Sequence, residues 1–319
     1  MNILSLTKNS FLCVKNYGSD IVRYMKYSQI GKTTLADKQL CAKILATSHV
    51  IEKGLSLRTP RLGFGKDRIT SLLILLKEYE SRKLPDNSFY YINAVSVLNA
   101  YINFHDENEF TLDIDVSELK DTFNKFTEIG GVKTFSKEEY IRLSTGNVET
   151  SISSRYSLRQ FSETPINEEI ITRALEIAQK TPSVCNRQSW ETYWAKSTHA
   201  MRTVRRLQSG NRGFGDEVDS FLIVTTDLSC FFGIEERNQS FIDGGLYAMN
   251  LMMALHSQGI GTCPLNWSTK VSIDRKLRVE LKIPHHMNII AVIAIGNLPD
   301  TFTVAKSARK PVSEVLKVV

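Results

Sequence analysis

The sequence predicts an α+β protein in two parts, a mainly helical N-terminal part and a C-terminal part that also contains strands. In residues 1–145 apolar side chains recur at helical spacing, and strand signals are scarce. After Thr145, short apolar and β-branched runs alternate with amphipathic segments. This change places a boundary within Tyr140–Thr150, so we expect a helical extension at residues 1–147 and a second domain at residues 148–319.

Two helices are predicted in the N-terminal part, on either side of a break at Pro-Asp-Asn, residues 85–87. Their apolar positions are Leu72, Leu73, Leu75, Leu76 and Tyr79 in the first, and Tyr91, Ala94, Val95, Leu98 and Ile102 in the second. An earlier helix ends near Gly54, and His49 and Glu52 can share one of its faces. No further metal ligands accompany that pair, so we expect a surface or interface contact and no metal site.

Three short strands are expected in the C-terminal part, at Glu191–Ala195, Phe221–Thr226 and Asn288–Ile295. The last is β-branched and apolar and stops at Gly296, as a central strand would. Asn167 is predicted to cap a helix, with two glutamates in its first turn. The helix at Leu246–Leu255 is apolar almost all round and ends before Gly259, so we expect it to be buried on every side, in a large core or an oligomer interface.

Composition excludes several classes of protein. Apolar residues make up 42% of the 319 residues and charged residues 23%, as in globular proteins. The longest apolar run, Ile289–Ile295, is far short of the ~20 residues that cross a bilayer, and the N-terminus lacks the apolar region of a secretory signal. The cysteines are odd in number, scattered and without a CxxC pair, which favours a reducing, cytoplasmic setting: Cys13, Cys41, Cys185, Cys230 and Cys263.

The net charge of +6 does not indicate a nucleic-acid-binding protein. The basic residues are spread over both halves, and no helix-turn-helix, aromatic-studded sheet or continuous basic helix is present. The glycine pairs at 63/65 and 213/215 are not part of a GxGxxG motif that follows a strand, so a Rossmann dinucleotide site is not supported either.

The segment from Ser154 to Phe161 is the most informative one. Arg155, Ser157 and Arg159 stand at alternate positions, so their side chains would share one face of an extended chain. Guanidinium groups and a hydroxyl suit phosphate oxygens, which suggests an anion site. By itself this pattern also fits an exposed basic loop.

Three further segments follow in order: TPSVCNRQSW at 181–190, GIGTCPLNW at 259–267 and KSARKP at 306–311. Together with the first segment, in this order and spacing, they resemble the nitroreductase family of FMN-dependent oxidoreductases over residues 150–319. The resemblance implies a mixed, largely antiparallel central sheet flanked by helices, and a homodimer with FMN at the subunit interface. It makes Leu246–Leu255 the candidate for that interface, and residues 315–319 a strand added to the partner's sheet.

The resemblance also assigns the phosphate end of FMN. It implies that Arg155 and Ser157 lie at the phosphate and ribityl chain, and that Arg159 lies near the N1–C2=O edge of the isoalloxazine ring. A cation there would stabilise the negative charge that reduction places at N1. Arg309 matches the C-terminal phosphate arginine of the family, with Lys306 as an assisting cation.

Other positions are implied to meet the ring. The turn that contacts the flavin bound mainly by the partner subunit corresponds to Pro182, Ser183, Asn186 and Gln188. Pro264, Leu265 and Asn266 would lie beside the ring, with a backbone N–H of Leu265 or Asn266 near N5. Asn211 falls where some members place an asparagine near the pyrimidine edge.

The chain departs from the family pattern at several of these places. Ser189 stands where a proline is usual, and Phe214 replaces a nearby lysine. Asn266 and Trp267 stand where an acidic residue and a glycine are frequent, so a different shape is expected on the substrate side.

The function implied is ping-pong reduction of a small conjugated acceptor, such as a nitroaromatic or a quinone, by NADH or NADPH through FMN. No catalytic side chain is expected, and Cys185 lacks the partners of a catalytic thiol. Two alternatives stay open: an FMN-dependent oxidase or dehydrogenase acting on a biosynthetic intermediate, and a non-catalytic dimeric binding module. For residues 1–147 we expect a lid over the flavin or an added oligomer contact.

Overall fold

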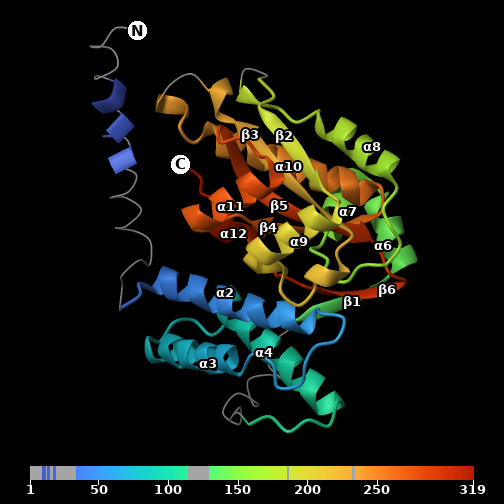
Figure 1. Ribbon diagram of the computed structural model, residues 1–319. Helices are drawn as coiled ribbons and strands as arrows, with labels where there is room; N and C mark the ends of the chain where they lie inside the picture. Colours follow the sequence, from blue (N-terminus) through green and yellow to red (C-terminus); the bar gives the residue numbers. More distant parts are fainter. Residues whose placement is uncertain are drawn as a thin grey trace. The chain divides into compact units, whose positions relative to one another are not determined.

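The computed structural model describes residues 9–11, 13–14, 17–18, 34–113, 129–184, 187–231 and 234–319 (Figure 1). The chain forms two units, one of residues 1–14 and 135–302 and the other of residues 15–134 and 303–319. The division falls within β1 (Val132–Ser136) and β6 (Thr301–Ala305), which pair with each other in a two-stranded sheet. The domain boundary expected at 147/148 stays a prediction.

The second unit is helical, as its apolar periodicity predicts. Its helices are α2 (Asp37–Leu55), α3 (Lys66–Ser81), α4 (Phe89–Glu107) and the short α12 (Val312–Val315). The first three share one core, in which Leu40, Ile44, Leu72 and Leu98 have no exposed surface. Ser88 begins α4 by accepting a hydrogen bond from the backbone N–H of Tyr91. The two helices predicted on either side of residues 85–87 are therefore confirmed. None of the described helices is long and apolar enough to cross a membrane.

Glu52 is a buried carboxylate of the same unit, only 2% exposed. Its Oε2 lies 3.0 Å from Nδ1 of His49, and its Oε1 accepts a 3.0 Å hydrogen bond from the backbone N–H of Gly131. The expected contact between His49 and Glu52 is thus present. The Glu52 carboxylate also holds the backbone at Gly131. Among the described residues no cluster of side chains could hold a metal ion.

The first unit is built on a four-stranded sheet. Its strands lie in the order β2 (Trp190–Ala195), β3 (Ser220–Asp227), β5 (Met287–Asn297) and β4 (Ile260–Asn266), and each neighbouring pair is antiparallel. The three predicted strands correspond to β2, β3 and β5, and β5 is an inner strand as expected. The predicted stop at Gly296 is wrong, because Gly296 still pairs with Gly261 of β4.

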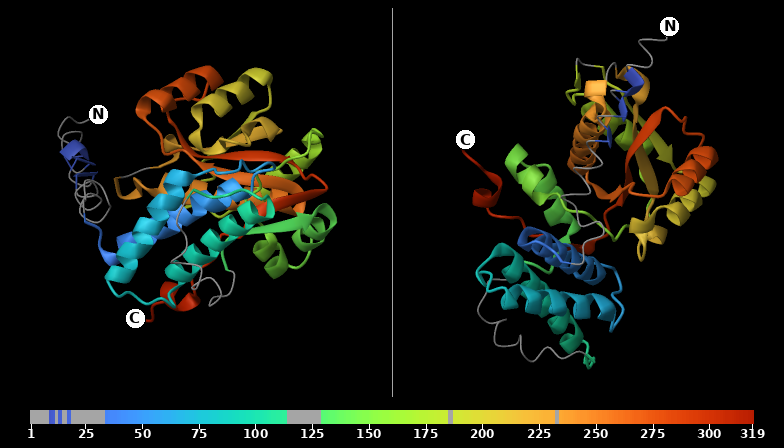
Figure 2. Two further views of the ribbon diagram at one scale, coloured as in Figure 1. Left: turned by 90° about the horizontal axis from the view of Figure 1, so that it is seen from below. Right: turned by 90° about the vertical axis from the view of Figure 1, so that its left-hand side faces the viewer.

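Helices cover both faces of this sheet. α8 (Glu168–Ala178) and α10 (Gln239–Ser257) share a core with the strands on one face, and α9 (Thr198–Leu207) and α11 (Val271–Leu281) lie on the other (Figure 2). Asn167 caps α8 as predicted, accepting a 3.0 Å hydrogen bond from the N–H of Glu169. The unit also contains α6 (Lys137–Ser144), α7 (Val148–Ser154) and the 3-10 turns η2 (Ser209–Asn211), η3 (Gly215–Glu217), η4 (Leu228–Cys230) and η5 (Ile234–Glu236).

Within its own chain, α10 is not buried on every side. One face packs under the sheet, with Leu251 and Leu255 fully buried. The other face exposes a row of large apolar side chains, which we call the α10 apolar face: Phe241 (55%), Ile242 (53%), Leu246 (46%) and Met249 (40%). The C-terminal end is as predicted, since Gly259 has a φ of +73°. The core of its own chain therefore does not enclose α10 on every side. The other expected setting, an oligomer interface, stays a prediction.

Candidate functional site

Residues 155–159 follow α7 as an extended segment, the conformation in which alternate side chains share one face. The backbone N–H of Leu158 donates a 2.9 Å hydrogen bond to the carbonyl of Thr262 in β4, and that of Ser162 donates a 2.9 Å bond to the carbonyl of Asn297 in β5. Leu158 is fully buried. The segment with the two arginines is therefore fixed against the sheet and is not an exposed basic loop.

Arg159 is the most buried cation of this segment, with 7% of its surface exposed. Its Nη1 donates a weak 3.5 Å hydrogen bond to the carbonyl of Ser157, and it forms no ion pair with a carboxylate in the part of the chain that the structure describes. Burying a charged group is costly unless an opposite charge or strong hydrogen bonds compensate it. The donor set of Arg159 therefore fits an anionic or carbonyl-rich ligand.

Arg155 lies near two buried aromatic side chains of the same unit. Burial, together with the charge of Arg155, lowers the pKa of His256 to about 4. Burial raises the pKa of Tyr140 to about 12, although Arg155 opposes that shift. The Nε2 of His256 lies 3.1 Å from Oγ of Ser154. Arg155 thus stands near the end of α10, and Ser157 is half-buried. The expected place of both residues at a phosphate stays a prediction.

The turn at residues 181–188 is held by side chains on either side of it. Pro182 and Gln188 are exposed, and Oγ of the half-buried Ser183 accepts a 2.9 Å hydrogen bond from the N–H of Gln188. Arg187 anchors the turn through a 2.6 Å ion pair with Glu236. Asn186 and Cys185 lie outside the described residues. The expected contacts of this turn with a flavin stay predictions.

Ser189, which replaces the usual proline, lies at the end of this turn. It is 3% exposed, and its buried hydroxyl has no hydrogen-bond partner among the described residues. Its backbone carbonyl accepts a 2.7 Å hydrogen bond from the N–H of Asp227. The backbone of Ser189 is therefore held by its hydrogen bond to the end of β3, and its side chain forms no hydrogen bond with the described residues.

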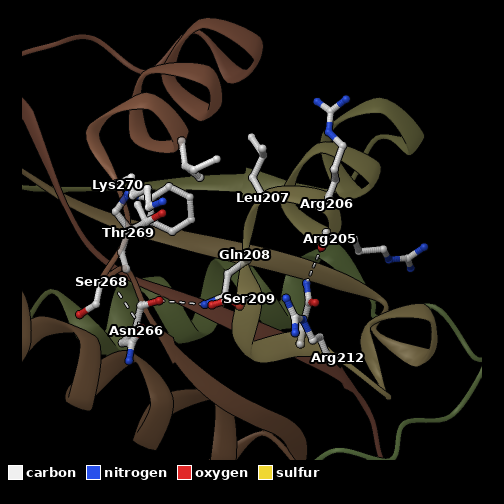
Figure 3. A pocket seen from close by; sticks show the side chains of 13 residues that line it. Arg205, Arg206, Leu207, Gln208, Ser209, Arg212, Asn266, Ser268, Thr269 and Lys270 are labelled. Carbon is white, nitrogen blue, oxygen red and sulfur yellow. Dashed lines mark hydrogen bonds between the residues drawn. The ribbon is translucent and has the colours of Figure 1, made fainter.

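Two of the predicted residues, Asn211 and Asn266, line one pocket of about 450 Å³ between η2 and the loop that leads from β4 to α11 (Figure 3). Gln208 joins the two sides, because its Nε2 donates a 2.8 Å hydrogen bond to the carbonyl of Asn266. Asn211 is 5% exposed and donates from Nδ2 to the carbonyl of Arg205 at 3.2 Å. The structure thus brings together two residues that are far apart in the sequence.

Trp267 forms part of the wall of this pocket. Its Nε1 donates a 2.8 Å hydrogen bond to Oδ1 of Asp274, whose Oδ2 accepts a 2.6 Å bond from Nε of Arg278. Burial alone would raise the pKa of Asp274, but these hydrogen bonds outweigh burial and lower it. The indole is thereby fixed by an ionised carboxylate. Beside it Leu265 is buried, whereas Pro264 is exposed.

Lys306 and Arg309 belong to the other unit. The backbone N–H of Lys306 donates a 2.9 Å hydrogen bond to the carbonyl of Gly131, and the exposed Arg309 donates from Nη1 to the carbonyl of Ser307. Their expected role at the phosphate stays a prediction.

The pocket is also lined by Gln208, Arg212 and Lys270, which were not predicted from the sequence. Gln208 ends an amphipathic arginine-rich stretch, and Lys270 precedes another amphipathic stretch. A search for polar residues at the ends of these two stretches would have found Gln208 and Lys270, whereas Arg212 stands at the end of neither.

Comparison with known proteins shows what the first unit is similar to. The model of the nitroreductase family matches residues 152–221 and 231–297. Among solved structures, an FMN-dependent nitroreductase from Clostridium difficile is 19% identical, with a TM-score of 0.40 over 46% of this chain and 84% of that chain. A nitroreductase family protein from Clostridium novyi is 16% identical, with a TM-score of 0.43 over 47% of this chain and 83% of that chain.

A third structure is of a protein assigned as a nitroreductase, in complex with FMN, from Desulfovibrio desulfuricans. It is 18% identical, with a TM-score of 0.43 over 54% of this chain and 95% of that chain. The assignment of this chain rests on the family model, whose matched range includes Arg155, Arg159, Asn211 and Asn266. The resemblance expected from the sequence is confirmed by the family model: the nitroreductase family matches the C-terminal part of this chain, at residues 152–221 and 231–297.

Proposed function

We propose that the protein is an FMN-dependent oxidoreductase that reduces a small conjugated acceptor, such as a nitroaromatic or a quinone, with NADH or NADPH as the electron donor. The observation that carries this proposal is Arg159, a buried guanidinium without a carboxylate partner among the described residues, within the range matched by the family model. When bound, FMN supplies the two-electron chemistry that no side chain of this chain offers.

Arg159 is the residue best suited to the N1–C2=O edge of the ring. A fixed, desolvated cation stabilises developing negative charge far more than a solvated one, because water does not screen it. The hydrogen bond from Leu158 to Thr262 holds the backbone beside it. Arg155 and Ser157, with Arg309 and Lys306, are the proposed phosphate and ribityl contacts, and the backbone of Leu265 and Asn266 is proposed to face N5.

Asn211 and Asn266 are proposed to contact the flavin, Asn211 near its pyrimidine edge. The pocket that they line with Trp267 is the proposed place for the acceptor beside the ring. Gln208 and Asp274 hold its walls through the hydrogen bonds to the Asn266 carbonyl and the Trp267 indole. Such preorganised walls can orient an acceptor without a further loss of side-chain entropy. The proposed catalysis therefore consists of positioning and electrostatics, with no general acid or base.

The proposed assembly is a homodimer that joins through the α10 apolar face. Four neighbouring large apolar side chains are exposed there, at 40% or more of their surface. A contiguous apolar patch of this kind is typical of a protein–protein interface. In such a dimer Pro182, Ser183, Asn186 and Gln188 would meet the flavin bound mainly by the partner. Residues 1–147 are proposed to add a lid or an oligomer contact, and the cytoplasm is the proposed location.

The test is the colour and redox behaviour of the purified protein. We expect a yellow protein that releases FMN on denaturation and bleaches under anaerobic conditions on addition of NADH or NADPH. A colourless protein that FMN cannot reconstitute would refute the proposal and favour a non-catalytic binding module. A yellow protein that neither nucleotide bleaches would favour the FMN-dependent oxidase or dehydrogenase.

A further inference from the structure

We infer that the pocket beside Asn266 and Trp267 binds an anionic group, so that the acceptor of the proposed reaction is a conjugated molecule that bears a carboxylate or a phosphate. The part about an acceptor rests on the proposed function, whereas the binding of an anion does not. We call this space of about 450 Å³ the acceptor pocket. Its volume lies within the range usual for small-molecule sites.

The lining of the acceptor pocket is rich in positive charge. Four cationic residues line it, and its lining contains no aspartate or glutamate: Arg205, Arg206, Arg212 and Lys270. They come from the end of α9, from the residue after η2 and from the residue before α11. The cationic residues of the lining therefore come from three places in the chain.

Carboxylates outside the pocket compensate two of these cations. Nη1 of Arg205 lies 3.5 Å from Oδ1 of Asp216, and Nη2 of Arg206 lies 2.5 Å from Oε1 of Glu280. In Figure 3 the guanidinium of Arg206 points away from Asn266. These two arginines serve mainly to attach α9 to its neighbours.

The other two cations have no such compensation. Neither Arg212 nor Lys270 pairs with a carboxylate of the described residues. The acid in the first turn of α11, Asp274, would be the natural counter-charge for Lys270, but it is already held by Arg278 and Trp267. A net positive charge is thus left on the pocket, where an anionic ligand would be attracted.

The positions of these groups define the shape of the ligand. In Figure 3 Lys270 and Asn266 lie on one side and Arg212 on the other, with Gln208 between them. Lys270 also precedes the first turn of α11, whose free N–H groups favour negative charge. Leu207, Trp267 and Ile273 supply an apolar wall. A ligand with a flat apolar body and an acidic group at one end would place its body against the apolar wall and its acidic group near the cations.

The test compares two ligands of nearly equal size that differ in charge, 4-nitrobenzoate and 4-nitrobenzamide. Their affinities for the oxidised, purified protein are measured by titration calorimetry, without turnover. We expect 4-nitrobenzoate to bind about tenfold more tightly at low salt, with the preference shrinking as salt is raised. Exposed ion pairs are weak, so Lys270→Gln and Arg212→Gln should each lower the nitrobenzoate affinity about threefold, and the double variant about tenfold.

Two matched controls lie on α11 outside the pocket, where Arg275 and Lys276 are exposed. Arg275→Gln and Lys276→Gln change the net charge equally and should leave both affinities within twofold of the wild type. Equal wild-type affinities for the two ligands, or equal losses in the controls, would overturn the inference.

A third ligand separates the acceptor from the other source of an anionic group, the phosphate of a nucleotide donor. If 2′,5′-ADP binds more tightly than 4-nitrobenzoate and loses affinity in the same variants, the assignment to an acceptor is overturned. The binding of an anion is tested independently of the proposed function. A protein that holds FMN but does not discriminate the ligands refutes only this inference. A colourless protein that discriminates them refutes the FMN chemistry, and with it the acceptor, but not the anion site.

Discussion

Gly261 of β4 lies directly opposite Gly296 of β5 in the register of the sheet. The segment that carries Arg159 packs over this pair. A Cβ atom on Gly261 would come within 2.8 Å of Cδ2 of Leu158, and one on Gly296 within 2.5 Å of Cδ1 of Phe161. Two facing glycines therefore create the space in which the arginine segment is seated.

A methyl group at either glycine should destabilise the protein. Gly296→Ala would push against Phe161, which is 1% exposed and whose Cδ1, Cγ and Cβ atoms all lie within 3.0 Å of the added methyl group. Overpacking of this kind costs about 1–3 kcal/mol of unfolding free energy. We expect that loss in urea denaturation of the flavin-free protein, with weaker FMN binding because the segment with Arg159 is displaced. Gly261→Ala should act in the same direction.

The matched control is Gly245→Ala in α10, where an added Cβ would meet no atom of the same chain within 4 Å. Because Gly245 lies beside the α10 apolar face, both variants are compared at a protein concentration at which the chain is monomeric. Alanine is favoured over glycine inside a helix, so this variant should be as stable as the wild type or more stable by up to about 1 kcal/mol. Wild-type stability in Gly296→Ala would contradict the proposed role of the glycine pair.

Much of the fold could be predicted because its patterns are local. α3, α4 and α8 follow from apolar side chains at helical spacing, and β3 and β5 from short β-branched runs. β4 was not predicted as a strand, since Gly261 and Pro264 interrupt it. It forms because it lies at the edge of the sheet, where proline is tolerated, and because β5 offers it a partner.

Less of the candidate site than of the fold could be predicted from the sequence. The arginine segment was recognised because its residues are contiguous and resemble a family. The acceptor pocket was not, because it exists only where the end of α9 meets the start of α11. Trp267 was noted as a departure from the family, but its bond to Asp274 depends on how α11 folds back.

Arg159→Met should separate stability from ligand binding. The buried guanidinium has no carboxylate partner among the described residues, so replacing it with an apolar side chain of similar length removes a desolvation penalty. We expect the flavin-free variant to unfold at the same urea concentration as the wild type or a higher one. The FMN affinity should fall by about tenfold or more, as expected for loss of a charged hydrogen bond.

Fluorescence titration with FMN, together with urea denaturation, checks both effects of Arg159→Met. Arg173→Met is the control, since Arg173 is exposed on α8. A variant that binds FMN as the wild type does would remove Arg159 from the proposed site. A variant that is strongly destabilised without FMN would mean that the guanidinium is structural.

The α10 apolar face should control assembly. Leu246→Asp combined with Met249→Asp places two charges in the exposed row, where they would be desolvated in a dimer. We expect the wild type to sediment as a dimer and the double variant as a monomer in analytical ultracentrifugation. Val279→Asp, at a position that is 79% exposed on α11, should leave the dimer intact. A monomeric wild type, or a dimeric double variant, would refute this interface.

His256 should make the stability of the protein fall in mild acid. Its pKa is lowered to about 4, chiefly by burial and further by the charge of Arg155, whereas in the unfolded chain it is about 6.5. Between pH 6.5 and about pH 4, the imidazole of His256 is therefore protonated in the unfolded state and neutral in the folded state. This group therefore lowers the unfolding free energy as pH falls below about 6.5, by at most ~1.4 kcal/mol for each pH unit, until the folded state is protonated near pH 4.

Urea denaturation at pH 7.5, 6 and 5 measures the contribution of His256. His256→Gln keeps a hydrogen-bonding group near Ser154 but cannot titrate, so its unfolding free energy should fall less steeply with acid than that of the wild type. His199→Gln is the control, since His199 is exposed at the start of α9 and should retain the wild-type slope. The comparison uses slopes because the substitution can change stability at every pH. Parallel slopes for wild type and His256→Gln would mean that protonation of His256 does not drive the loss, and that the acidic groups alone account for it.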